Sequence, residues 1–371
     1  MGKETEEQIL QILTAERIDL VATLPCDRAK QLFALVPGHF KHVPLSREEE
    51  GVGICAGAYL AGARPMLLIQ SSGVGNMINA LCSLTKLYEL PLPILVSWRG
   101  IYKENITAQG PMGKYLPGIL EALDIDYTEI HERDEVPLIG SVLRDSYRNN
   151  TIHAALLSPK IWGSAPSGGI GERAVKTAPE VRKSPRPALT RFEIIKAAAP
   201  YIEGKVVVCN LGIPCKELYH VMHQESNFYM LGSMGMASPL GLGMAMNTEK
   251  EVVVIDGDGS LLMNPGILAT VSMARPRNLT ILAVDNGVYG STDNQPTATA
   301  TCADLGAVAG ALGMERVYRV SDERGLGNAF EDPGKGPKFV HALAKPGNAE
   351  VPDIPLTPLQ IKEQVMEALR K

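Results

Sequence analysis

Short apolar runs rich in β-branched residues recur along this chain, and segments with helical spacing separate them. Runs of this length are too short for helices and are typical of buried strands. Strands that alternate with helices predict a parallel, doubly wound sheet. We expect strands at residues 18–24, 65–70, 93–98, 152–157, 206–209, 252–255, 279–284 and 339–343.

The segments between the strands predict helices. Residues 5–17 and 358–369 are amphipathic, whereas residues 48–60 are rich in small side chains. Another helix should begin after Thr190, because Thr190 and Glu193 have the spacing of a capping box. With its strands, each half of the chain therefore has the elements of an α/β domain.

The boundary between the two halves is predicted from composition. Residues 163–188 are mainly Gly, Pro, Ser, Ala and charged residues, which is the composition of a linker with little to bury. A chain of 371 residues has the length of two ordinary domains. We therefore expect one α/β domain at 1–162, a linker at 163–188 and a second α/β domain at 189–371, with no domain between them.

Composition and charge narrow the class of protein. The formal net charge is −5 without a basic block, so nucleic acid and anionic membranes are not expected as partners. No apolar run has the length of a membrane span, and the first residues lack the pattern of a signal peptide. The six cysteines form no C-x-x-C pair, which favours free thiols in a reducing compartment. We expect a cytoplasmic protein.

Polar side chains follow two of the predicted strands directly. The strand at 252–255 leads into the sequence DGDGS, which contains Asp258, and the strand at 279–284 leads into Asp285-Asn286-Gly287. In an open α/β sheet the carboxyl ends of the strands share one edge, where ligands bind. Asp258 and Asn286 therefore offer two oxygen donors of the kind that Mg²⁺ prefers.

The spacing of these two clusters carries a resemblance. The sequence GDGS, followed 28 residues later (286 minus 258) by the Asn of NG-x-YG, resembles the cofactor motif of the thiamine diphosphate (ThDP)-dependent decarboxylase superfamily. The resemblance implies that Asp258 and Asn286 bind Mg²⁺ together with the main-chain carbonyl of Val288. It also implies that the first half is a pyrimidine-binding (PYR) domain and the second a diphosphate-binding (PP) domain. The alternative is a strand–turn–helix without a cofactor.

A second motif lies in the first half. The sequence from Glu48 to Gly57 resembles the E-x-x-x-x-G-x-A-x-G helix of the same superfamily, with Cys55 in place of Ala. The resemblance implies that Glu48 hydrogen-bonds N1′ of the aminopyrimidine and shares a proton with it, which activates the cofactor. The alternative is an acidic helix start that the helix dipole favours.

Glycine-punctuated stretches are candidates for the remaining cofactor contacts. By the resemblance, residues 70–76 line the pyrimidine side, while Gly235, Gly257, Gly259 and Ser260 approach the diphosphate. Met234 would hold ThDP in its bent form. The candidates are Gln70, Ser71, Ser72, Gly73, Asn76, Gly232, Ser233, Met234, Gly235, Gly257, Gly259, Ser260 and Tyr289.

Asp27 is the other candidate for proton chemistry. It follows the first predicted strand in Pro25-Cys26-Asp27, where superfamily members carry a similar turn, and it would contact substrate or relay a proton. A simple N-cap is the alternative. Pyruvate decarboxylases carry paired histidines near the position of Gln70-Ser71-Ser72 in this chain, so protonation of the product must use another group.

The predicted domains have no middle domain between them, and residues 65–76, 99–114 and 232–245 resemble most specifically the two subunits of the sulfopyruvate decarboxylases joined head to tail. That family implies conversion of 3-sulfopyruvate to sulfoacetaldehyde and CO₂ in the coenzyme M biosynthesis of methanogenic archaea. A dianionic substrate needs cationic contacts, for which Arg99, Lys103 and Lys114 are the candidates. The superfamily also implies a homodimer or higher oligomer with active sites between subunits.

Three alternative functions remain open. Phosphonopyruvate decarboxylases have the same minimal architecture and a substrate that differs by one charge. A non-catalytic ThDP-binding regulatory protein would need no equivalent of Glu48. A nicotinamide-dependent dehydrogenase would need a G-x-G-x-x-G after a first strand, which this sequence lacks.

Overall fold

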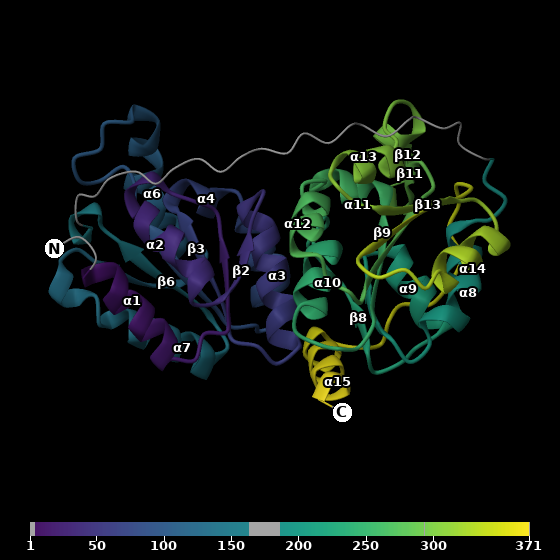
Figure 1. Ribbon diagram of the computed structural model, residues 1–371. Helices are drawn as coiled ribbons and strands as arrows, with labels where there is room; N and C mark the ends of the chain where they lie inside the picture. Colours follow the sequence, from purple (N-terminus) through teal and green to yellow (C-terminus); the bar gives the residue numbers. More distant parts are fainter. Residues whose placement is uncertain (1–3, 163–185, 293, 371) are drawn as a thin grey trace. The chain divides into compact units, whose positions relative to one another are not determined.

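The computed structural model describes residues 4–162, 186–292 and 294–370, which separate into an N-terminal and a C-terminal compact unit (Figure 1). The predicted linker 163–188 falls almost wholly outside these ranges, so its boundaries stay a prediction. Among the described residues, none of the helices has both the length and the apolar character that a membrane crossing requires.

The N-terminal unit is built around a six-stranded parallel sheet in the order β2-β1-β3-β4-β6-β5. Its strands are β1 (Leu20–Thr23), β2 (Lys41–Pro44), β3 (Pro65–Gln70), β4 (Leu92–Ser97), β5 (Asp126–Ile130) and β6 (Ile152–Leu157). Its helices are α1 (Glu4–Ala15), α2 (Lys30–Leu35), α3 (Glu48–Leu60), α4 (Ser71–Gly75), α5 (Ile78–Ala80), α6 (Gly110–Ala122) and α7 (Leu138–Asn149).

The C-terminal unit has a second six-stranded parallel sheet, in the order β13-β14-β10-β9-β7-β8. Its strands are β7 (Val206–Cys209), β8 (Asn227–Tyr229), β9 (Val252–Gly257), β10 (Leu279–Asp285), β13 (Arg316–Val320) and β14 (Lys338–Leu343), with a small hairpin of β11 (Val288–Tyr289) and β12 (Gln295–Pro296). Its helices are α8 (Arg191–Ile202), α9 (Ile213–Val221), α10 (Ala237–Ala245), α11 (Asp258–Met263), α12 (Ile267–Ala274), α13 (Leu305–Ala311), α14 (Glu323–Glu331) and α15 (Pro358–Arg370).

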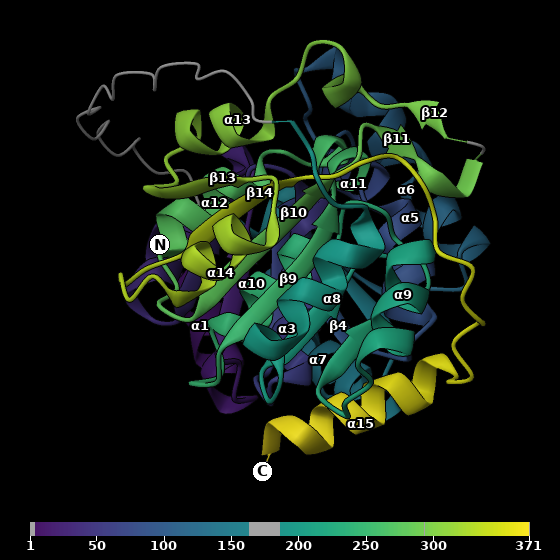
Figure 2. The ribbon, with the colours of Figure 1, turned by 90° about the vertical axis from the view of Figure 1, so that its right-hand side faces the viewer.

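Both sheets have one topology. When the main strands of each unit are numbered from one, both orders read 2-1-3-4-6-5. In the C-terminal unit, α8 packs with α9 and α14, while α10 packs with α12 and against the central strands (Figure 2). The direction of winding reverses between β1 and β3 in one unit and between β7 and β9 in the other. Open α/β sheets bind ligands at the carboxyl ends of the strands beside such a point.

The central strands form where the sequence is continuously apolar. Every residue of β4 is buried, and in β3 and β9 all but the last residue are buried. Helices cover both faces of such a parallel sheet, so apolar side chains are favoured on both sides. The predicted doubly wound parallel fold is therefore confirmed, and the predicted central strands agree with the structure to within one or two residues.

The predicted helix ends are also close to those observed. The helix expected at 5–17 stops at Ala15, and the last helix begins at Pro358 as expected. The capping box is confirmed: the backbone N–H of Glu193 donates to Oγ1 of Thr190, and the Glu193 carboxylate accepts from the N–H of Thr190 at 2.7 Å. Such a cap contributes about 1 kcal/mol of stability.

Candidate functional site

A pocket of about 180 Å³ lies at the carboxyl ends of the C-terminal strands. Asn210 and Leu211 enter it after β7, and the residues that end β9 and begin α11 enter beside them, so the pocket sits where the winding reverses. The predicted residues that line it are Met234, Gly257, Asp258, Gly259, Ser260, Asn286, Val288 and Tyr289. A larger cavity of about 460 Å³ lies at the opposite ends of the strands, away from these donors.

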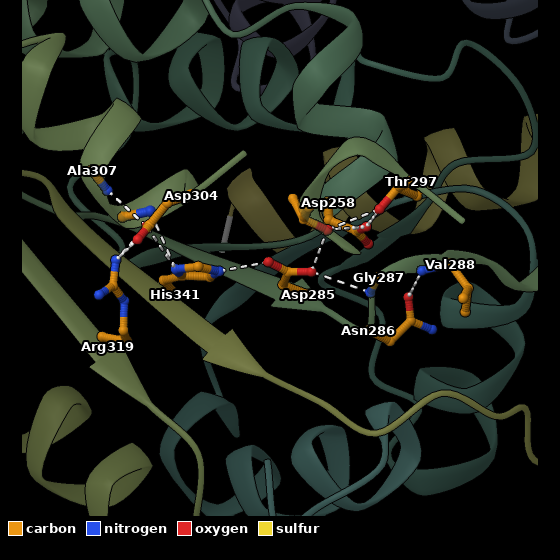
Figure 3. Close-up of polar contacts among 12 residues, drawn as sticks. Asp258, Asp285, Asn286, Gly287, Val288, Thr297, Asp304, Ala307, Arg319 and His341 are labelled. Atoms are coloured by element: carbon orange, nitrogen blue, oxygen red, sulfur yellow. Dashed lines mark hydrogen bonds and ion pairs between the residues drawn. The ribbon is translucent and has the colours of Figure 1, made fainter. Parts of the chain in front are cut away.

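Asp258 is the first residue of α11 and is 3% exposed. Its Oδ2 accepts a hydrogen bond from the hydroxyl of Thr297, and the hydroxyl oxygen of Thr299 lies 3.0 Å from the same Oδ2 (Figure 3). Burial raises the pKa of Asp258 above the ordinary value, and the negative charge of Asp285 raises it further. A cation beside this carboxylate would offset the cost of its buried charge.

Asn286 follows β10 and is also buried. Its Oδ1 accepts the backbone N–H of Val288 at 3.2 Å, which turns this carbonyl oxygen toward the loop (Figure 3). Within the described part of the chain, its buried Nδ2 has no hydrogen-bond partner. Because an unsatisfied buried donor is costly, a bound group that carries an acceptor, such as a phosphate oxygen, would fit here.

The donor set suits a hard cation that carries a phosphorylated group. Asp258 and Asn286 both line the pocket with Val288, whose main-chain carbonyl is the third predicted ligand. Mg²⁺ commonly binds through one or two protein oxygen ligands together with phosphate oxygens. No described cluster of three or more His, Cys, Asp or Glu residues forms an alternative metal centre.

The glycines of the pocket have identifiable packing roles. A Cβ on Gly259 would lie 2.3 Å from the ring of Tyr289, so only glycine allows this contact. Gly235 has φ +90°, and its N–H donates to Oγ of Ser260 at 3.0 Å. The N–H of Gly257 donates to the Asp256 side chain. Diphosphate binding by Gly235 and Gly257 therefore stays a prediction, because these amides already have internal acceptors.

In the N-terminal unit, three predicted residues meet at the start of α3. Glu48 is 4% exposed, and its Oε2 accepts from Nδ2 of Asn76 at 2.9 Å. A Cβ on Gly73 would lie 2.5 Å from the Glu48 side chain, so glycine is required for this approach. The carboxylate is thus held from two sides.

The neighbouring glutamates have other roles. Oε1 of Glu50 accepts the backbone N–H of Ser46 at 2.6 Å, and Glu49 pairs with Arg47 at 3.3 Å. Glu48 is therefore the one of the three whose carboxylate is buried beside Gly73 and Asn76, as its place in the motif predicts. The alternative interpretation of Glu48, a solvated acidic helix start, therefore does not apply.

Arg99 is a predicted substrate contact, and the structure places its side chain in a buried ion pair. Its guanidinium is 3% exposed and binds Glu104 through two contacts, Nε to Oε2 at 2.7 Å and Nη2 to Oε1 at 2.9 Å. The hydrogen bond from Arg99 lowers the pKa of Glu104 to about 2. The pair anchors the loop after β4, with Cys26 beside Nη1, and substrate binding by Arg99 stays a prediction.

The remaining candidates of the N-terminal unit are spread around the strand ends. Ser71 accepts the N–H of Arg99 at 3.1 Å, whereas Gln70 and Ser72 are half-buried. Lys103 and Lys114 are exposed. Asp27 is also exposed and is the first residue of a short 3₁₀ helix whose N-cap position belongs to Cys26, so the N-cap interpretation of Asp27 is wrong.

Sequence reasoning missed four residues that hold the site: Thr297, Thr299, Asp285 and His341. The two threonines lie in a polar stretch without a motif. Asp285 directly precedes the predicted ligand Asn286, and His341 is a polar residue within the otherwise apolar end of β14. The position of Asp285 beside Asn286 and the polar side chain of His341 within an apolar strand are the two features of the sequence that indicate these residues.

Comparisons with known proteins agree with this geometry. The thiamine pyrophosphate enzyme family matches twice, its N-terminal TPP binding domain over residues 3–122 and its C-terminal TPP binding domain over residues 207–342. A sulfopyruvate decarboxylase of Methanosarcina acetivorans is 44% identical over 98% of this chain and 97% of its own length.

Two further relatives are informative. The beta subunit of a sulfopyruvate decarboxylase of Methanococcus maripaludis is 46% identical over 49% of this chain and 99% of its own length. A phosphonopyruvate decarboxylase of Streptomyces viridochromogenes is 32% identical over 91% of this chain and 88% of its own length. The predicted resemblance is thus confirmed along the chain.

Proposed function

This chain belongs to the thiamine pyrophosphate enzymes and is a ThDP-dependent decarboxylase. We propose that it converts 3-sulfopyruvate to sulfoacetaldehyde and CO₂, with Mg²⁺ as the second cofactor. The observation that carries the proposal is the full-length similarity to a sulfopyruvate decarboxylase. The pocket that contains Asp258 and Asn286 supports it, because its donors suit a cation with a diphosphate. The corresponding pathway would be coenzyme M biosynthesis.

The residues of the chain have distinct tasks in this proposal. ThDP supplies the electron sink for the breaking carbon–carbon bond. Asp258, Asn286 and the Val288 carbonyl would hold its Mg²⁺, and Met234 lines the same pocket. The buried Glu48 carboxylate, held by Asn76, would bind the pyrimidine and move a proton at its own oxygen.

Substrate preference separates the two candidate activities. We expect kcat/KM for 3-sulfopyruvate to exceed that for 3-phosphonopyruvate by at least about tenfold, which corresponds to about 1.4 kcal/mol of transition-state binding. Anaerobic assays of CO₂ release from both substrates, with ThDP and Mg²⁺, measure the ratio. The similarity to a phosphonopyruvate decarboxylase makes the reverse preference the second candidate. A ratio in favour of phosphonopyruvate would replace the proposed substrate and leave the cofactor chemistry intact.

We also propose a homodimer in which Glu48 of one subunit and Asp258 of the other serve one cofactor. The similarity of about half of this chain to a separate beta subunit supports this arrangement. Co-expression of Glu48→Gln and Asp258→Asn chains should therefore restore about a quarter of wild-type activity, because about half of the dimers are mixed and each has one intact site of two. Activity no higher than that of the separate variants, or a monomer in sedimentation of the active protein, would contradict it.

A further inference from the structure

His341 lies in β14, outside the pocket, and is 2% exposed. The backbone N–H of Gly306 donates to its Nδ1 at 3.2 Å, so Nδ1 accepts and the ring proton is assigned to Nε2. Nε2 then donates to Oδ2 of Asp285 at 2.7 Å (Figure 3). Asp304 lies 3.8 Å from Nδ1, beyond hydrogen-bonding distance, and pairs with Arg319 instead.

Asp285 ends β10 and receives donors on both carboxylate oxygens. Beside the His341 contact on Oδ2, its Oδ1 accepts the Thr299 hydroxyl at 2.7 Å and the N–H of Gly287 at 3.2 Å. Charge-assisted hydrogen bonds of this kind fix both the position and the plane of a carboxylate. His341 is therefore one of the groups that determine where Asp285 Oδ1 lies.

Thr299 connects Asp285 to the predicted cation ligand. Its Oγ1 lies 2.7 Å from Oδ1 of Asp285, 3.0 Å from Oδ2 of Asp258 and 2.8 Å from Oγ1 of Thr297, so its one hydroxyl proton is shared between the two carboxylates. Thr297 also donates to Oδ2 of Asp258. Both threonine contacts thus fall on one oxygen of Asp258, so the other oxygen can serve a ligand in the pocket.

We propose that His341 is a positioning residue for the cation site: through Asp285 and Thr299 it fixes the Asp258 carboxylate in the orientation that binds Mg²⁺. The inference rests on the proposed function, because that cation is the one that ThDP carries. Groups that orient metal ligands typically change metal affinity 10–100-fold when they are removed. His341 acts without contact with substrate or cofactor.

Two substitutions separate positioning from structural support. The amide of His341→Gln can place a donor where Nε2 lies and keep the hydrogen bond to Asp285. The amide of His341→Asn can place an acceptor where Nδ1 lies, which keeps the Gly306 contact but loses the one to Asp285. Mg²⁺ affinity of the full-length protein is measured by calorimetric titration at saturating ThDP, and the melting temperature of the cofactor-free protein is measured in parallel.

We expect His341→Asn to raise the Kd for Mg²⁺ about 10–100-fold and His341→Gln to stay within a few-fold of wild type. The reverse ranking, or unchanged Mg²⁺ affinity in both variants, would overturn the proposal and assign His341 to the support of α13 through Gly306. A wild-type protein that binds no Mg²⁺ with ThDP would instead overturn the proposed function before any variant is compared.

A second pair keeps the test decisive if the His341 variants do not fold. Thr299→Val removes the hydroxyl between Asp285 and Asp258 with little change of shape, and we expect the same 10–100-fold loss of Mg²⁺ affinity. Thr301→Val is the matched control, because the exposed Thr301 hydroxyl contacts the carbonyl of Ala298. Equal Mg²⁺ affinities in the two valine variants would overturn the proposed path from His341 to Asp258.

Discussion

Replacing Glu48 with glutamine is expected to lower kcat about 10³-fold, within the range for loss of a positioned acid or base. Glutamine has nearly the same shape, and its carbonyl oxygen can still accept from Asn76 Nδ2, so the fold around α3 should persist. The rate of CO₂ release from sulfopyruvate and the Kd for ThDP are measured on the same preparation. Loss of rate with ThDP still bound is the expected combination.

Glu49→Gln is the matched control for this experiment. The substitution is chemically identical and one position away, but Glu49 pairs with Arg47 at the edge of the helix. We expect its kcat to stay within about twofold of wild type, because the Glu49 carboxylate pairs with Arg47 and does not lie beside Gly73 and Asn76. Equal losses in the two variants would remove Glu48 from its assigned role.

Replacing Asp258 with asparagine is expected to abolish Mg²⁺-dependent ThDP binding and activity, because it removes the one carboxylate among the three predicted ligands. The same change should leave the cofactor-free protein at least as stable as wild type. Burial raises the pKa of Asp258, so its ionised form is disfavoured in the folded state. Calorimetric titration and thermal unfolding of the cofactor-free protein test both parts.

The raised pKa of Asp258 determines how the stability of the cofactor-free protein and its Mg²⁺ binding change with pH. A carboxyl group whose pKa is raised by folding makes the cofactor-free protein more stable as pH falls through that pKa, and less stable as pH rises through it. Mg²⁺ binding has the opposite trend, because protons compete for Asp258.

Asp256→Asn is the matched control for Asp258→Asn. Asp256 is equally buried, but its carboxylate accepts a hydrogen bond from Ser238 at 2.8 Å, so Mg²⁺ binding should survive its replacement. Retained Mg²⁺-dependent binding in Asp258→Asn would contradict the assignment.

The strands that sequence analysis found and missed differ in one physical respect. In the two six-stranded sheets, all eight predicted strands are interior members, whereas the four missed strands, β2, β5, β8 and β13, are the sheet edges. Interior parallel strands are buried on both faces and therefore read as apolar runs. In β5 and β13 only the last residue is fully buried, so charged side chains interrupt the pattern. The edges of these sheets follow from tertiary pairing, which local composition does not encode.

The site shows the same division between local and long-range information. Glu48, Asp258 and Asn286 belong to motifs with fixed spacing, and the structure places each of them in a buried polar setting. The Asp285–His341 contact joins residues 56 positions apart, and it arises because β10 and β14 are adjacent parallel strands. Likewise, the sequence alone presents Arg99 as an unpaired cation, whereas the structure shows that the loop brings Glu104 into contact with it. Such partners require the strand order before they can be predicted.

The most direct test of the central claim is CO₂ release from 3-sulfopyruvate by protein stripped of cofactor, assayed anaerobically with ThDP and Mg²⁺ added singly and together. The account predicts turnover when both are present, and a return to background when either is omitted. Turnover without ThDP would contradict the cofactor assignment. Tight ThDP binding without CO₂ release from sulfopyruvate or phosphonopyruvate would contradict the decarboxylase function and favour a regulatory ThDP-binding protein.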